Sequence, residues 1–181
     1  EQLYSKLTET NADIAYCDLF NPEKEEFYLK SREFDLTAFL NASFIDNCSL
    51  IRRSIIGNAR YDEMLNRKKL EDYDFLLNLI INNGAKAVYQ PSTKLNYRVF
   101  ETGSISGRDS VRYHYEIYLD ILEKYLDKLP HEIYKAVCEN LMVLEERLDS
   151  LLKHHDDVTD YVNRLKKERD QLERSLKKER D

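Results

Sequence analysis

The C-terminal part of the sequence carries a seven-residue repeat that a long α-helix satisfies. Counted from Tyr134, two rows of positions advance by seven residues, and they are apolar or Tyr except at His155, Arg169 and Glu179. The last proline, Pro130, precedes this start, and no glycine follows it. The repeat therefore predicts one continuous helix from about residue 130, and its end is typical of a coiled coil.

The apolar face of this helix changes in width. Before about residue 153 it is broadened by further apolar residues: Ile133, Met142, Val143 and Leu152. We therefore expect residues 108–154 to form a helical extension that packs on a globular body. Beyond that point only a narrow seam remains, so residues 155–181 are expected to be a coiled coil or a single helix.

Both interpretations of the last segment have support in the sequence. In a parallel pair, Glu168 would face Glu173 of the neighbouring chain, which is repulsive. Opposite charges four residues apart, such as Lys166 and Asp170, could instead support a solvated single helix at about 0.2–0.5 kcal/mol per pair. We favour weak self-association, because the seam continues in register from Tyr134.

Composition narrows the function classes. The net charge of −6 argues against a general nucleic-acid binder, and the four glycines form no phosphate-binding loop motif. No apolar run is long enough for a membrane-spanning helix. The three widely separated cysteines favour a reducing, cytoplasmic setting, and Cys17 and Cys48 are expected to be inert core residues within strands.

The first part of the chain, residues 1–107, mixes short strand and helix patterns. Strands are predicted at 13–17, 26–30, 48–52, 86–90 and 94–99, with Pro91 and Ser92 separating the last two. Helices are predicted at 2–10, 36–41 and 71–83, with Asp35 capping the second and Gly84 ending the third. A further helix is expected from 109 or 110 to about 129. Strands alternating with helices indicate an α/β sheet.

Three carboxylates open the helix predicted at 71–83. Glu71, Asp72 and Asp74 lie in its first turn, where the helix dipole favours acidic residues, so plain capping explains them. A catalytic role is the alternative, and the neighbouring segments favour it.

These segments, taken in order, resemble the C-terminal half of a family 2 glycosyltransferase domain of the GT-A fold. The matching stretches are Asp13-Ile-Ala-Tyr-Cys-Asp18, Ser49-Leu-Ile-Arg-Arg53, Gly57 with Tyr61-Asp62-Glu63, Glu71-Asp72-Tyr73-Asp74, Gly84 to Tyr89, and Tyr97-Arg98 with Ser104 and Ser106. The resemblance covers residues 1–107. It implies an α/β fold that is half of a GT-A domain, followed by the helical extension and the coiled-coil-like helix.

The resemblance implies inverting transfer of a sugar from a nucleotide-sugar donor to a glycan acceptor, as in bacterial surface polysaccharide synthesis. Asp72 would be the catalytic base, and Glu71 would tune it. The donor and diphosphate side would involve Arg98, Ser104 and Ser106. The acceptor side would involve Tyr61, Asp62, Glu63 and Tyr73. The family uses a divalent metal, Mg²⁺ or Mn²⁺, to stabilise the leaving diphosphate.

Two departures from the family pattern limit what this chain is expected to do alone. Phe100 stands where the family has a histidine near the metal and the diphosphate, and no D-x-D segment precedes Asp13. We therefore expect a fragment that lacks the donor half, holds no metal by itself and is inactive alone. It would lie in the cytoplasm, either free or attached peripherally to the inner face of the membrane. The alternative function is a non-catalytic oligomerisation or scaffolding module built from a degenerate transferase remnant and a coiled coil.

Overall fold

The computed structural model describes residues 1–66, 68–98 and 111–178, and within the last range it describes side chains for 116–146, 149–150 and 153–169. The chain divides into two compact units, Glu1–Val137 and Cys138–Asp181. The predicted site residues all belong to the first unit. Phe100, Ser104 and Ser106 lie outside the described residues, so the predictions for them are not addressed by the structure.

In the described part of the first unit, four strands form one mixed sheet around β1 (Ile14–Asn21). β1 pairs in parallel with β4 (Ala87–Asn96) and antiparallel with both β2 (Glu26–Leu29) and β3 (Leu50–Ile51). All residues of β1 are buried except Phe20, which is half-buried. The mixed α/β class expected from the sequence is confirmed, with β1 as its central strand.

Several details of the sheet differ from the prediction, and β1 extends to Asn21 instead of ending at residue 17. Residues 87–96 form one strand, whereas the sequence predicted two strands separated by Pro91 and Ser92. The register with β1 jumps between Tyr89 and Lys94, so the proline lies in a bulge, where its missing N–H costs no ladder hydrogen bond. Residues 48 and 49 lie in a turn before β3, so Cys48 is exposed and is not the core strand residue expected.

Several helix ends of the first unit lie where the sequence signals placed them. Helix α1 (Gln2–Glu9) contacts β1 and β4. Helix α2 (Leu36–Asn41) begins where the Asp35 carboxylate accepts a hydrogen bond from the Ala38 N–H at 2.7 Å, as predicted. Helix α4 (Glu71–Leu77) continues as a π-helical turn, η2 (Asn78–Asn82), and ends at Gly84 with φ +70°. The short helix α3 (Arg53–Ile56) and the 3-10 turn η1 (Glu63–Leu65) were not predicted.

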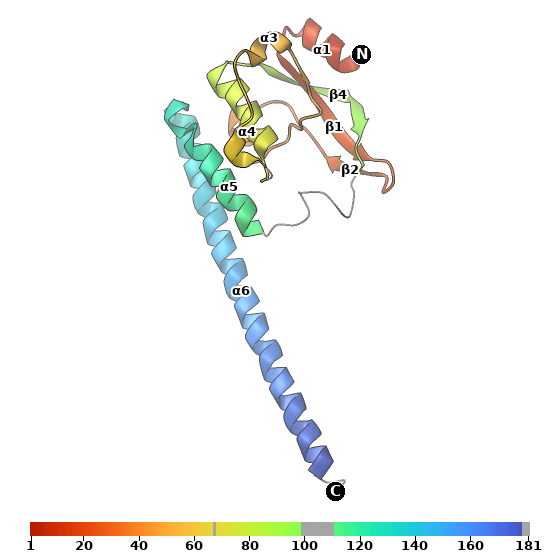
Figure 1. Ribbon diagram of the computed structural model, residues 1–181, viewed down its shortest axis with the longest axis vertical. Coiled ribbons are helices and arrows are strands. Elements are labelled where there is room, and N and C mark those ends of the chain that lie inside the picture. Colours follow the sequence, from red (N-terminus) through yellow and green to blue (C-terminus); the bar gives the residue numbers. More distant parts are fainter. Residues whose placement is uncertain (67, 99–110, 179–181) are drawn as a thin grey trace. The chain divides into compact units, whose positions relative to one another are not determined.

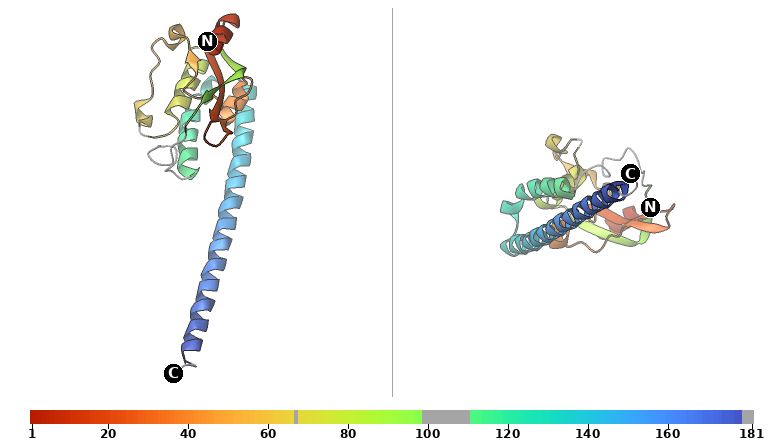
Figure 2. Two further views of the ribbon diagram at one scale, coloured as in Figure 1. Left: turned by 90° about the vertical axis from the view of Figure 1, so that its right-hand side faces the viewer. Right: turned by 90° about the horizontal axis from the view of Figure 1, so that it is seen from below.

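The helix predicted up to residue 129 is shorter than expected. Helix α5 (Val111–Glu123) is followed by the 3-10 turn η4 (Leu126–Lys128), and α6 (His131–Lys178) begins after Pro130. The three views of the ribbon show α4 and α5 on the same side of the sheet (Figures 1 and 2). Tyrosines join these layers: the Tyr118 hydroxyl donates to the carbonyl oxygen of Leu40 in α2, and the Tyr125 hydroxyl donates to Asp74 in α4. Leu76 and Ile121, which face the interior from α4 and α5, are almost completely buried.

The second unit is the remainder of α6, which runs without interruption over 48 residues in all (Figure 2). The single long helix predicted from the repeat is confirmed as a helix. Met142 and Val143 are 63% and 61% exposed, and the seam residues Val158, Val162 and Leu165 are 41–47% exposed. This unit has described apolar side chains but buries none of them, unlike the first unit.

Candidate active site

A pocket of about 470 Å³ lies at the start of α4 and is the candidate active site. Its lining residues are Asn47, Tyr61, Asp62, Glu63, Asn66, Lys68, Glu71 and Asp72. Five residues that the sequence predicted for the catalytic and acceptor sides are therefore brought together, although the chain separates them into two groups. The volume is within the usual range for small-molecule sites.

The backbone around the pocket explains how these two groups meet. Glu71 and Asp72 open α4 directly after Leu70, which has a left-handed conformation with φ +67°. That conformation is unusual for a residue other than Gly, Asn or Asp. The 61–63 group leads into η1 at Glu63, and the Asp62 side chain caps this turn by accepting a hydrogen bond from the Met64 N–H. The aromatic ring of Tyr61 stacks on Phe75 of α4 at 4.5 Å between ring centroids, which attaches this loop to the helix.

Among the titratable groups that line the pocket, Asp72 has the environment expected of a general base. Burial raises the pKa of its carboxyl above the ordinary value, and the negative charges of Glu71 and Asp46 raise it further. A hydrogen bond of 2.9 Å from the Tyr73 N–H acts in the opposite direction. A raised pKa makes the carboxylate a better proton acceptor near neutral pH.

Asp62, on the opposite group of lining residues, has the reverse electrostatic environment. Its carboxylate accepts hydrogen bonds from Lys124 Nζ and, at 2.8 Å, from the Met64 N–H. These two donors hold the pKa of Asp62 below its ordinary value. The pocket thus contains one carboxyl whose pKa is raised and one whose pKa is lowered, a division typical of sites in which two acids have different roles.

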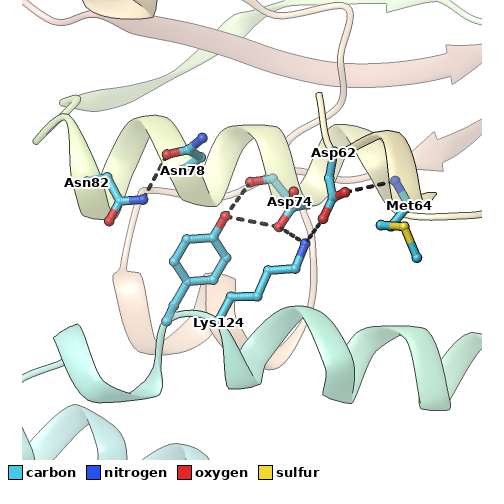
Figure 3. Close-up of polar contacts among 7 residues, drawn as sticks. Asp62, Met64, Asp74, Asn78, Asn82 and Lys124 are labelled. Atoms are coloured by element: carbon cyan, nitrogen blue, oxygen red, sulfur yellow. Dashed lines mark hydrogen bonds and ion pairs between the residues drawn. The ribbon is translucent and has the colours of Figure 1, made fainter. Parts of the chain in front are cut away.

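Lys124 connects the pocket to the helix layer, as Figure 3 shows. Its ammonium group lies between Asp62 and Asp74 and reaches the Asp74 carboxylate at 3.2 Å. The Tyr125 hydroxyl donates to the same Asp74 oxygen at 3.0 Å. Asp74 is 4% exposed, and its carboxylate is satisfied by groups on the segment that follows α5. Its role is therefore structural, although in the sequence it cannot be distinguished from Asp72.

Two predicted site residues lie elsewhere. Tyr73, expected on the acceptor side, is 1% exposed, and its hydroxyl donates to the carbonyl oxygens of Phe39 and Leu40. The structure therefore places Tyr73 in the core and not among the residues that line the pocket. Arg98, expected on the diphosphate side, is exposed beyond the end of β4 and does not line the pocket either.

Other residues of the site were missed by sequence reasoning. Asn47, Asn66 and Lys68 line the pocket, and Lys124 orients Asp62. Asn66 and Lys68 follow η1 closely, so their nearness to the Tyr61 group was a usable signal. Lys124 lies more than sixty residues from Asp62 in the chain, and no local pattern could have found it.

A second pocket has a larger volume, about 640 Å³, but its side chains are less suited to catalysis. It is lined by α1 and by parts of β1, β3 and β4, including the thiols of Cys17 and Cys48. Burial raises the pKa of the Cys17 thiol, and partial burial of the thiol together with Asp46 raises that of Cys48 to about 11. Both thiols stay protonated at neutral pH, which leaves them poor nucleophiles.

The described residues offer no ready metal site. Within them, no group of three or more His, Cys, Asp or Glu side chains is arranged to hold a metal ion. The residues of the pocket therefore do not fit a metal site. Likewise, no helix in the described ranges has both the length and the apolar character needed to cross a membrane.

Comparison of the chain with protein-family models, with curated proteins and with solved structures finds no match.

Proposed function

We propose that the first unit is the acceptor-binding and base-bearing part of an inverting glycosyltransferase related to the GT-A family. The observation that carries this proposal is the meeting of Tyr61, Asp62, Glu63, Glu71 and Asp72 in one pocket, with the pKa of Asp72 raised. The ordered motifs between Asp13 and Arg98 add support, since they resemble that family along the same stretch of chain.

The proposed step is a single displacement at the anomeric carbon of the donor sugar. An acceptor hydroxyl oxygen forms a bond to that carbon, and the bond from the carbon to the nucleoside diphosphate oxygen breaks. Asp72 takes the hydroxyl proton as the new bond forms. General-base catalysis of this kind contributes roughly 10²–10⁴ in rate.

Other residues of the pocket bind and tune. The Tyr61 ring is 53% exposed and is supported on one face by Phe75, so its free surface can pack against the apolar C–H face of a sugar. The negative charge of Glu71 helps to keep the pKa of Asp72 high. The Asn47 and Asn66 amides are suited to hydrogen bonds with sugar hydroxyls. Among the described lining residues, four carboxylates against one lysine, Lys68, favour a neutral or cationic acceptor over an anionic one.

Stabilisation of the leaving diphosphate is assigned to no described residue of this chain. The divalent metal that the family resemblance implies finds no ligand group among the described residues. The proposal therefore concerns acceptor binding and proton removal only.

A scaffolding role remains the second candidate, and the exposed seam of α6 favours it. A scaffolding module does not require a carboxyl with a raised pKa in an open pocket. The two functions are therefore separated by the consequences of removing the Asp72 carboxylate.

The test is Asp72→Asn in the natural full-length protein, assayed for transfer from a set of nucleotide sugars to glycan acceptors. Asn keeps the shape but accepts no proton, so we expect the rate to fall roughly 10²–10⁴-fold. Asp127→Asn is the matched control, since Asp127 is exposed on η4 outside the pocket, and it should keep the wild-type rate. Wild-type turnover in Asp72→Asn, or no sugar transfer by the wild-type protein, would contradict the proposal.

A further inference from the structure

The second unit presents a narrow apolar stripe that remains exposed. Val158, Val162 and Leu165 are 47%, 41% and 45% exposed, and Tyr161 beside them is 56% exposed. Spacings of four and three residues place the first three on one face of α6. In heptad terms Val162 occupies position a, while Val158 and Leu165 occupy position d, the two positions that face a partner helix in a coiled coil.

We propose that residues 144–169 pair antiparallel with the same residues of a second copy of this chain. The twofold axis of the pair passes between Asp156 and Asp157. This inference is independent of the proposed transferase function, because it rests on α6 alone.

Charges beside the seam select the antiparallel arrangement and its register. In an antiparallel pair the e positions of the two helices face each other, and so do the g positions. About the proposed axis, Glu145 at e meets Lys166 of the second copy, and both are exposed. The g positions follow the same rule in the sequence: position 147 holds Arg and meets Glu168 of the second copy. Symmetry makes each match occur twice, and such pairs set orientation and partner choice.

Other arrangements lose these matches. Sliding one copy by a heptad brings Glu145 opposite Thr159 or opposite Glu173, according to the direction. In a parallel pair Glu145 and Lys166 would face Asn140 and Tyr161, while position 168 would meet position 173, which are both Glu in the sequence. Charge complementarity therefore favours two copies antiparallel over two copies parallel.

The seam itself fits the same register. His155 at position a packs against Val158 of the second copy, on either side of the axis. A parallel pair would instead bring the two His155 imidazoles together, which is unfavourable whenever both are charged. A histidine in the central layers also predicts an association weaker than that of an all-aliphatic seam.

Charge reversal tests the pairing, with sedimentation equilibrium of the whole chain at low salt as the measurement. Lys166→Glu changes two attractive pairs per dimer into repulsive ones, so we expect the dissociation constant to rise about tenfold or more. Adding Glu145→Lys to this variant should restore the dissociation constant to within about threefold of the wild-type value. Lys167→Glu is the matched control: the charge change is the same, but position f faces away from the seam, and the change should be small.

Disulfide cross-linking tests the direction of the helices, in a background where Cys48 and Cys138 are replaced by Ser. In the proposed pair the two Val162 positions lie about 16 Å apart along the axis, so Val162→Cys should form no cross-linked dimer. Leu144→Cys combined with Arg169→Cys should cross-link, because these positions meet across the antiparallel seam. Cross-linking by Val162→Cys alone would overturn the proposal in favour of a parallel pair. A monomer at high micromolar concentration, or no rescue by the double charge swap, would overturn it as well.

Discussion

The two units of the chain differ in how far they bury their apolar side chains. The first unit buries Phe39, Leu76 and Ile121 to within 1% of complete burial. The second unit leaves Val158, Val162 and Leu165 more than 40% exposed. The first unit can therefore hold a preorganised pocket, because its side chains are fixed by packing. The described part of the second unit buries none of its apolar side chains, so these residues are available to another helix.

Leu76→Ala is expected to have the largest effect on this contrast. It removes a side chain that is 1% exposed and leaves a cavity, at a cost of about 2–5 kcal/mol in the free energy of unfolding. Leu165→Ala is the counterpart in the second unit and should leave the unfolding transition of the first unit unchanged. Denaturant titration measures both variants. Equal losses would show that the two units are not distinct in packing.

Asp74→Ala should have the next largest effect. The change removes the common acceptor of Lys124 and Tyr125, and the buried Tyr125 hydroxyl loses its carboxylate partner. A loss of about 1–3 kcal/mol is expected, and Asp74→Asn should lose less because one acceptor oxygen remains. Thermal unfolding measures the loss. A neutral Asp74→Ala would mean that the contact between α4 and the segment after α5 is not held by this network.

Smaller effects of opposite sign are expected at two of the pocket acids, Asp62 and Asp72. The pKa of Asp62 is lowered, so its ionised form stabilises the fold above the ordinary pKa, and this stability is lost as the pH falls. Asp62→Asn should therefore destabilise the protein at pH 7 by about 0.5 kcal/mol, the size of a partly exposed ion pair.

Asp72 should behave in the reverse sense. Its pKa is raised, so its contribution to stability is complete below the unfolded pKa of about 3.9 and is lost as the pH rises through the folded value. Asp72→Asn should therefore be more stable than the wild type at pH 7, with the difference vanishing in acid. Melting temperatures between pH 3 and pH 8 check both acids. Destabilisation by both substitutions at pH 7 would remove the electrostatic contrast between them.

Local signals in the sequence were sufficient for most helices. Asp35 capped α2, Gly84 ended the helix that begins at Glu71, and Pro130 preceded α6 as expected. Each of these depends on a few neighbouring residues. The unpredicted elements α3 and η1 are one-turn pieces without a periodic apolar pattern.

Long-range packing determines the structural features that local sequence signals did not predict. Pro91 was interpreted as a break, but pairing with β1 on either side of a bulge kept β4 as one strand. Asp72 and Asp74 looked alike as acids in a first helical turn, and only Tyr125 and Lys124 distinguish them. Tyr73 was interpreted as a candidate acceptor contact, whereas its hydroxyl is bound to α2 in the core.

The most direct test of the account is a carboxyl ¹³C NMR titration of Asp72 and Asp62 in the whole chain. The central claim is that the first unit holds Asp72 ready to accept a proton while Asp62 stays ionised beside Lys124. We predict that the pKa of Asp72 lies above the ordinary value for aspartate, that the pKa of Asp62 lies below it, and that Glu71→Gln lowers the pKa of Asp72. A pKa of Asp72 at or below the ordinary value would contradict the account.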